Sequence, residues 1–396
     1  MNTFLGVSYG DQKAKEGFYK EVCEMVLNRF YNDTNLLYGW YDHCLRKSGD
    51  LAWFMSDEEL LKEIQDHLNI MDISHLEIFT VEEDARVWHG VAKENGVLLR
   101  GLNDHFFVVD VIKGGPADKA GFKLGDEILT LNGEEIHSMW DIIHFNGSGT
   151  LKRIENGVEK NIVFILVPEI VSVSYEPVIS RVSKDTGLIK ITSFRLDLFK
   201  TPNWKKTINK MNSYEKLVID LRNNTGGSFV AALRALSPFF CSVPTEIGKL
   251  YKPRMRSQLN YEFKDGDNEL EQFEAFKAYE TVSLKTFEGY GCYKGRVTIL
   301  MNNQTASVSE IFSKSLEKRK NVRLFGTNSS GSVVLSVWYW IKFHKKKYSI
   351  SIPEANFISY DNSVLEGVGL TPSKDLFYEH EDLSNGVDTW VKEAIN

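Results

Sequence analysis

The sequence contains no hydrophobic run long enough to cross a membrane as a helix. Its longest purely apolar stretch, residues 162–167, has only the length of a β-strand. The N-terminal residues 1–13 contain neither a basic leader nor a long apolar segment, so they show no secretory signal. We therefore expect a soluble chain without a membrane span, cytoplasmic as it reads, and periplasmic or secreted if a leader was removed.

Cysteines are few, and positive charges are outnumbered by negative ones. The four cysteines, Cys23, Cys44, Cys241 and Cys292, form no CxxC pair, and they indicate neither an obvious disulfide framework nor a metal-ligand cluster, so we expect buried or free thiols. Lys and Arg number 47 against 54 Asp and Glu, which gives a formal net charge of −7. Without a basic stripe interleaved with aromatics, this balance argues against nucleic acid as the main partner. The sequence thus predicts no metal, no cofactor and no nucleic-acid partner.

What the sequence does contain is the length of a protein with two or three domains. It has 396 residues, of which 42% are hydrophobic and 26% charged. Residues 1–87 read as a helical region, because apolar side chains recur there at helical spacing and a capping-box pattern precedes one apolar stripe. The first stripe is Phe18, Val22, Met25, Val26 and Phe30, and the capping box is Ser56 with Glu59.

Beyond this region the pattern changes twice. Residues 88–170 contain short apolar strands broken by glycines, and the pairs Asn132-Gly133 and Asn156-Gly157 are typical of tight hairpin turns. In residues 171–396 strands alternate with helices. The expected strands are 188–191, 217–220 and 297–301, and the expected helices are 204–211, a segment from about residue 229, and 308–316. This alternation predicts an α/β core of parallel β-α-β units within an α+β multidomain chain.

Residues 244–294 fit neither pattern. They are rich in charge and aromatics, and we favour an ordinary insertion over a lid or an arm.

Two turns of the α/β core contain candidate catalytic residues, one with paired glycines and one with a serine. The turn 220–227 follows a buried strand and ends in Gly226 and Gly227, where a backbone without side chains can approach a substrate closely. Ser307 joins a strand to a helix, so its hydroxyl lies at a helix N-terminus, where unpaired N–H groups favour an oxyanion. Each feature has a simpler explanation, since paired glycines serve ordinary turns and Ser307 with Glu310 has capping-box spacing.

The segment 114–133 resembles a PDZ domain of the bacterial processing-peptidase kind. The match is carried by Gly115-Pro116-Ala117, Ala120-Gly121, Leu124-Gly125-Asp126 and Ile128. The resemblance implies an open sheet edge to which an extended peptide adds a strand, with its terminal carboxylate held by backbone N–H groups. It therefore implies a peptide-binding segment around Gly115, Gly121 and Gly125.

Taken together, residues 88–375 resemble the C-terminal processing, or tail-specific, serine peptidase superfamily. The features that support the resemblance are the turn 220–227, a serine three residues before Glu310, and the motif Glu366-Gly367-Val368-Gly369 before Pro372. The resemblance implies a helical region, a PDZ domain and a ClpP/crotonase-like core in that order, which we assign to residues 1–87, 88–170 and 171–396. It also implies Ser307 as nucleophile, with the N–H groups of Val308 and of Gly226 or Gly227 as the oxyanion hole.

The chain departs from the Ser/Lys branch of this superfamily at its general base. That branch places a lysine about 25 residues after the nucleophile, where this chain has Ser332. The tricorn-like branch instead uses a histidine that follows a serine in the region before the PDZ domain, which Ser74-His75 matches, and an acidic partner that Glu366 matches. We therefore interpret His75 as the general base and Glu366 as its partner, acting directly or through Ser74.

The resulting hypothesis is a serine peptidase that acts on unfolded or tail-exposed protein or peptide substrates through a Ser307 acyl-enzyme. The alternative is a catalytically inactive relative that serves as a peptide- or ligand-binding scaffold. A third interpretation is a Ser/Lys enzyme whose base has migrated, for example to Lys314 or Lys342, although Lys314 lies two helical turns beyond Ser307. An oligomer is possible under each interpretation.

Overall fold

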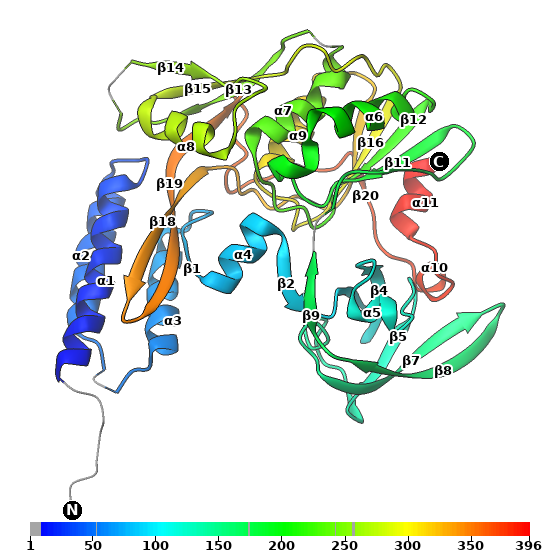
Figure 1. Cartoon of the computed structure of the whole chain (residues 1–396), viewed down its shortest axis with the longest axis horizontal. Helices are drawn as coiled ribbons and strands as arrows, with labels where there is room; N and C mark the ends of the chain where they lie inside the picture. The colour runs from blue at the N-terminus through cyan, green and yellow to red at the C-terminus, as the bar shows by residue number, and fades with distance from the viewer. Residues whose placement is uncertain (1–8, 53, 173–174, 242, 256–257) are drawn as a thin grey trace, which may run out of the picture.

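The structure is a computed structural model that describes residues 9–52, 54–172, 175–241, 243–255 and 258–396. Residues 1–8, part of the stretch that was searched for a leader, lie outside the described residues. The α+β multidomain architecture predicted from the sequence is confirmed (Figure 1). Among the described helices, none is both long and apolar enough to cross a bilayer.

The N-terminal region is a set of three helices. These are α1 (Tyr9–Arg29), α2 (Asn35–Gly49) and α3 (Asp57–Leu68), and they are followed by η1 (Asn69–Met71), β1 (Glu77–Thr80) and α4 (Val81–His89). The predicted apolar stripe of α1 faces inward, and the capping box of α3 forms, with the Glu59 carboxylate accepting from Ser56 N at 2.7 Å. The helices share one apolar core with two strands from far along the chain, β18 (Leu335–Phe343) and β19 (Lys346–Ser359) (Figure 1).

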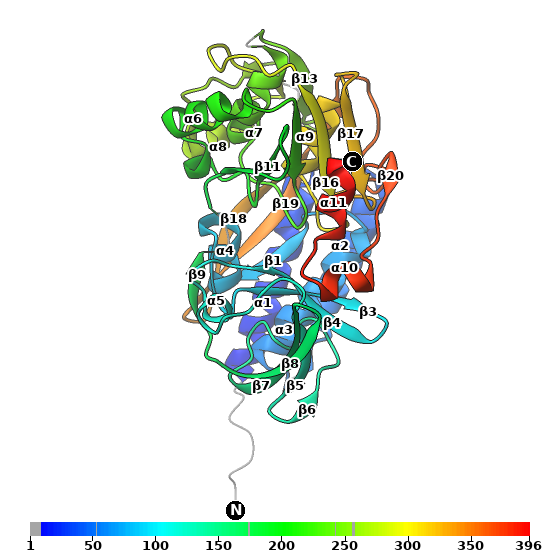
Figure 2. The ribbon, with the colours of Figure 1, turned by 90° about the vertical axis from the view of Figure 1, so that its right-hand side faces the viewer.

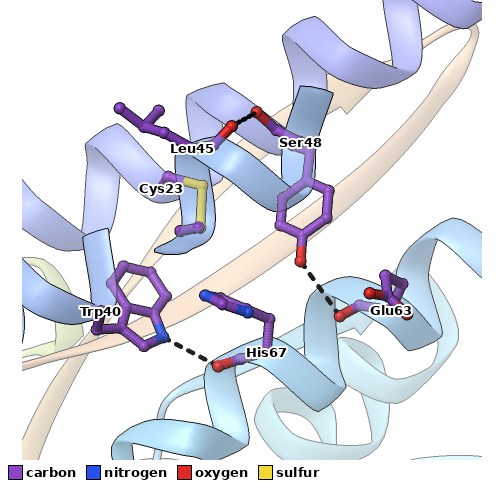
Figure 3. The surroundings of a disulfide bond; sticks show 8 residues. Cys23, Trp40, Leu45, Ser48, Glu63 and His67 are labelled. Carbon is purple, nitrogen blue, oxygen red and sulfur yellow. Dashed lines mark hydrogen bonds between the residues drawn. A yellow bond between two sulfur atoms is a disulfide. The ribbon is translucent and has the colours of Figure 1, made fainter. Parts of the chain in front are cut away.

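The expectation of free or buried thiols is wrong. Cys23 of α1 pairs with Cys44 of α2, and Cys241 pairs with Cys292. The sequence could not reveal the first pair, because two cysteines 21 residues apart meet only once α1 and α2 lie side by side. Figure 3 shows this bond beside the contact that ties α2 to α3, in which Trp40 Nε1 donates to the His67 carbonyl at 2.9 Å.

Residues 91–172 form an antiparallel sheet with a short helix. Its strands are β3 (Val97–Leu102), β4 (His105–Val111), β5 (Glu127–Leu131), β6 (Glu134–Glu135), β7 (Gly147–Glu155) and β8 (Val158–Leu166), with helix α5 (Pro116–Lys119). The sheet order β3-β4-β5-β7-β8 leaves β3 and β8 at its edges. Both Asn-Gly pairs have positive φ at each residue, as a type I′ hairpin turn requires. A separate pairing of β2 (Val91–Glu94) with β9 (Glu169–Ser172) closes this region.

The α/β core contains the predicted parallel sheet. Its order is β10 (Ile179–Arg181), β11 (Thr186–Lys190), β12 (Lys216–Asp220), β16 (Arg296–Met301), β17 (Val322–Gly326) and β20 (Lys374–Asp375). All neighbours from β11 to β20 pair in parallel. Four helices accompany these strands: η2 (Leu196–Phe199), α6 (Thr201–Met211), α7 (Phe229–Leu236) and α9 (Val308–Leu316). Because β12 and β16 are adjacent and parallel, the turns after their carboxyl ends lie next to each other.

Residues 244–294, which follow η3 (Ser237–Phe240), form part of a second sheet. They contain β13 (Glu246–Tyr251), β14 (Asn260–Glu262), α8 (Glu269–Ala278) and β15 (Thr281–Lys285). Strand β13 pairs with β19, so the segment joins the sheet that also contains β1. Its apolar side chains Ile247, Leu250 and Leu284 are buried in the main core, so the segment is an integral part of the fold.

The C-terminal segment returns to the PDZ-like sheet. Helix α10 (His380–Ser384) lies against β4, and α11 (Thr389–Ile395) packs on β12 and β16 (Figure 2). Leu383 is fully buried, and the His380 ring meets that of Phe107 at 5.2 Å between centroids. The last twenty residues therefore connect the α/β core to the PDZ-like sheet.

Candidate active site

A cavity of about 490 Å³ brings together residues from three distant parts of the chain. It is lined by Ser74 and His75 between η1 and β1, by Gly226 and Gly227 after β12, and by Ser307 after β16. The fold thus unites the predicted nucleophile, base and oxyanion turn. Glu366 and Val308 do not line the cavity, but each adjoins a residue that does.

Ser307 occupies a strained turn at the N-terminus of α9. Its backbone has φ 58° and ψ −126°, a conformation that L-residues rarely adopt and that costs about 1–3 kcal/mol. The preceding turn is fixed by two contacts to the neighbouring turn: Thr305 Oγ1 donates to the Leu221 carbonyl at 2.9 Å, and Ala306 N donates to the Asn224 carbonyl at 3.0 Å. These contacts hold the strained residue where its side chain lines the cavity.

Glu310 braces this turn from inside the protein. Its fully buried carboxylate accepts from Ser307 N at 3.1 Å, from Gly331 N at 2.8 Å and from Ser332 N at 2.9 Å, and also from the Ser329 hydroxyl. Burial raises the pKa of Glu310, although these donors oppose the rise. The sequence pattern indicated only a capping partner, whereas the structure makes Glu310 a link between the Ser307 turn and residues 329–332.

The glycine turn approaches Ser307 so closely that side chains are excluded. A Cβ on Gly226 would lie 2.9 Å from Ser307 Cβ and 3.0 Å from Val308 N, and both Gly226 and Gly227 have positive φ. Gly226 N donates to Asn224 Oδ1 at 2.9 Å, so this N–H is already engaged. For the N–H groups of Gly227 and Val308, no hydrogen bond to the described residues is found.

His75 is held in place by its backbone as well as its ring. It has a left-handed φ of 59°, and its carbonyl accepts from the hydroxyls of Ser336 at 3.1 Å and Ser351 at 2.6 Å. Its Nε2 lies 3.2 Å from the Ser332 carbonyl oxygen. Because a carbonyl only accepts, Nε2 carries the proton, and Nδ1 of the neutral ring is the basic nitrogen.

The charge state of His75 is set mainly by its surroundings in the cavity wall. Burial lowers the pKa of His75, while the carboxylates of Glu77 and Glu366 and the Ser332 carbonyl act in the opposite direction. The neutral ring is therefore favoured at neutral pH, which is the form that can take a proton.

Glu366 positions the His75 turn through backbone contacts. Its carboxylate accepts from Ser74 N at 3.1 Å, and from Val333 N and Val334 N at 2.7 and 3.0 Å. The sequence left open whether Glu366 acts on His75 directly or through Ser74. The structure has a hydrogen bond between Glu366 and Ser74, and it is donated by the Ser74 backbone N–H. The Ser74 hydroxyl itself is buried and has no hydrogen-bond partner among the described residues.

The position of the family lysine, Ser332, also lines the cavity. Its hydroxyl lies 2.6 Å from that of Ser330. Lys314 pairs with Glu317 and Asp361, each at 3.0 Å, and neither Lys314 nor Lys342 is among the described residues that line the cavity.

Sequence reasoning missed the walls of the cavity. They are built largely from α4, α8 and β18, and include the aromatic side chains Phe79, Trp88, Phe229, Phe273, Phe276 and Trp338. The only signal available was the aromatic richness of residues 244–294, which contain α8. Nothing in the sequence could place α8 in the same cavity as Ser307.

The three glycines predicted to mark a peptide-binding segment have different surroundings. Gly115 caps α5, and Gly121 follows that helix with φ 79° and open space around it. Gly125 faces the chain's own C-terminal segment, because a Cβ there would lie 2.0 Å from the Leu383 carbonyl oxygen. Gly125 is therefore a packing position for α10.

Comparisons with known proteins agree with this architecture. The sequence model of peptidase family S41 matches residues 185–375, and that of the PDZ domain matches residues 96–150. A "Probable CtpA-like serine protease" of Staphylococcus aureus is 23% identical over 359 residues, covering 87% of this chain and 64% of the relative. The "Carboxy-terminal processing protease CtpA" of Bacillus subtilis is 23% identical over 293 residues, covering 70% of this chain and 54% of that protein.

The chain thus spans less than two thirds of the length of these curated relatives. Among solved structures, mature CPAF complexed with lactacystin is similar, with a TM-score of 0.62, 14% identity and 97% of both chains covered. At that identity the likeness concerns the fold.

Proposed function

We propose that the chain, which matches the sequence model of peptidase family S41 over residues 185–375 and that of the PDZ domain over residues 96–150, is a serine peptidase of that family acting on unfolded or tail-exposed proteins. Within the family we propose the tricorn-like arrangement, with Ser307 as nucleophile, His75 as general base and Glu366 as the carboxylate that positions the base. The observation that carries the proposal is the single cavity shared by Ser307, His75 and the Gly226-Gly227 turn.

The proposed reaction begins with attack of Ser307 Oγ on the carbonyl carbon of a peptide bond. Nδ1 of His75 takes the hydroxyl proton, since Nε2 already donates to the Ser332 carbonyl. The developing oxyanion is stabilised by Gly227 N–H and Val308 N–H, because Gly226 N–H is engaged by Asn224.

The intermediate then collapses to an acyl-enzyme. The C–N bond breaks, and the His75 imidazolium returns its proton to the leaving amine. A water molecule, deprotonated by His75, attacks the Ser307 ester. The ester bond breaks, the acyl product leaves, and the His75 imidazolium returns its proton to Ser307 Oγ. The Glu366 carboxylate fixes the Ser74-His75 turn and favours the imidazolium by its charge.

The two disulfides support a proposal about location. Disulfides persist in oxidising compartments and are rare where thiols are kept reduced. We propose that the chain works in such a compartment.

Hydrolysis of an unstructured protein by wild type and Ser307→Ala tests the function. We expect wild type to degrade the substrate and Ser307→Ala to lose this activity while remaining folded, since loss of a serine cap costs only about 1 kcal/mol. Undiminished turnover by a folded Ser307→Ala protein would exclude the assignment. Absence of turnover in wild type, with retained peptide binding, would favour the inactive scaffold.

A further inference from the structure

One wall of the cavity is a cluster of three aromatic rings, of which Trp88 is exposed and Phe79 and Trp338 are partly buried. Trp88 of α4 meets Trp338 of β18 edge to face at 5.0 Å between ring centroids, and Phe79 stacks on the same Trp338 at 6.2 Å. Trp88 remains 37% exposed, and all three rings line the cavity. This wall therefore presents aromatic surface to any molecule that enters.

Another part of the lining is built by α7 and α8. Phe229 meets Phe276 edge to face at 5.7 Å, and Phe273 joins them in the lining. Gln272 fixes α8 to the start of α7, since its Oε1 accepts from the Ser228 hydroxyl at 3.0 Å. Because Ser228 directly follows Gly227, this wall has a fixed position relative to the oxyanion turn.

The charged groups in the lining are unevenly balanced. Glu77 and Glu269 are both exposed, and neither has an ion pair with another described residue. Among the described residues that line the cavity, the Lys or Arg side chain is that of Arg195, which is already paired, because it binds Asp197 at 2.8 Å and donates to the His89 carbonyl. Two carboxylates thus remain available to a ligand.

Carboxylates and aromatic faces attract the same kind of group. A cation is drawn to unpaired carboxylates and also to the faces of Trp rings, whereas an apolar side chain gains by leaving water for an aromatic wall. We propose that the cavity selects peptides in which an aromatic or large aliphatic residue is flanked by lysine or arginine. This inference rests on the proposed peptidase function, since it assigns the substrate class of the same site.

Binding to the 396-residue Ser307→Ala chain tests the inference separately from catalysis. The probes are dye-labelled peptides with a central Phe flanked by Lys, and matched peptides with Gln or Glu for Lys or with Ala for Phe. All are C-terminally amidated, so that a carboxylate-reading PDZ domain does not contribute. We expect the Lys peptide to bind about fivefold more tightly than the Gln peptide, because one partly exposed ion pair contributes about that much, and we expect the Glu peptide to bind most weakly.

Salt and variants identify the groups responsible. Raising NaCl from about 0.05 M to about 0.5 M should reduce the ratio of affinities between the Lys and Gln peptides, because salt screens charge interactions. It should not change the ratio between the Phe and Ala peptides. Glu77→Gln with Glu269→Gln should abolish the Lys preference, and Phe273→Ala should weaken the Phe preference. The control is Glu82→Gln on α4, which makes the same change of charge outside the lining and should change neither.

Equal affinity for the Lys, Gln and Glu peptides, or a Lys preference unchanged in the double variant, would overturn the inference. So would failure of all the peptides to bind. The proposed function fails instead if wild type does not hydrolyse an unstructured protein, and the two failures are therefore distinguishable.

Discussion

At the scale of single residues, the pH dependence of activity reports on His75. Burial lowers the pKa of this imidazole from its ordinary value of 6.5, and a general base works only when neutral. We therefore predict that kcat/KM falls as the pH drops through a pKa below 6.5. A pH–rate profile from about pH 4 to about pH 9 measures this, and a profile that stays flat across the acid limb would contradict it.

The same shift has a consequence for stability. A histidine whose pKa is lower in the folded than in the unfolded state stabilises the fold above the unfolded pKa, and that contribution is lost as the pH falls. Acid should therefore weaken both the activity and the fold.

Glu366 offers a test of positioning at the same scale. Glu366→Gln replaces one carboxylate oxygen by an NH₂ group that faces backbone N–H donors, where an unsatisfied donor costs about 1–3 kcal/mol. We predict that kcat falls by roughly one to two orders of magnitude, and by less than in His75→Ala, which removes the base. Glu82→Gln serves as the control with the same change of charge. A loss in Glu366→Gln as large as in His75→Ala would mean that Glu366 does more than hold the turn.

The sequence predicted which residues meet at the site better than it predicted how they are held. Short sequence motifs in three segments identified Ser307, His75 and the paired glycines, and these residues line one cavity. Their supports were identified only in part. Glu310 was marked as a capping partner, but its contact with Ser332 N and the contact of the Ser332 carbonyl with His75 involve backbone atoms that no residue pattern marks.

At the scale of secondary-structure elements, the Cys23–Cys44 bond should stabilise the helical region. Closing a loop of 21 residues is expected to contribute about 3 kcal/mol, chiefly by restricting the unfolded chain. We predict that the double variant Cys23→Ala, Cys44→Ala melts at a lower temperature than wild type in circular dichroism. Unchanged melting of the helical signal would show that the bond does not constrain the unfolded region.

Local signals in the sequence were reliable for helices and strands. Helix α9 spans residues 308–316 as predicted, and the strands 217–220 and 297–301 fall within β12 and β16. Long-range pairing was out of reach. The pairing of β13 with β19 joins residues about a hundred positions apart, and the role of residues 244–294 became clear only from that pairing.

At the scale of the whole molecule, the PDZ-like sheet and the α/β core are connected by the C-terminal segment. Arg222, in the turn after β12, donates to Asp388 at 2.7 Å and to the Tyr378 hydroxyl at 2.9 Å. Leu383 in the same segment is buried, and its carbonyl faces Gly125 of the PDZ-like region. One short segment thus contacts both the turn that bears Gly226-Gly227 and the PDZ-like sheet.

The PDZ domain leads to a prediction about peptide ends. Because β3 and β8 are the edges of its sheet, an extended peptide can add a strand there. A free terminal carboxylate of the peptide can then accept hydrogen bonds from backbone N–H groups. Peptides with a free apolar C-terminus should bind Ser307→Ala more tightly than their amidated forms in calorimetry. Equal affinity would remove the carboxylate-reading role and leave the fold assignment intact.

The proposed mechanism requires Ser307 to be an activated nucleophile with His75 as its base. Labelling with a fluorophosphonate, followed by peptide mapping, tests this directly, because the reagent phosphonylates activated serines with loss of fluoride. We predict one adduct, on the peptide that contains Ser307, formed rapidly by wild type, slower by several orders of magnitude in His75→Ala, and not at all in Ser307→Ala. An adduct on another serine, or equal labelling rates in wild type and His75→Ala, would contradict the proposed mechanism.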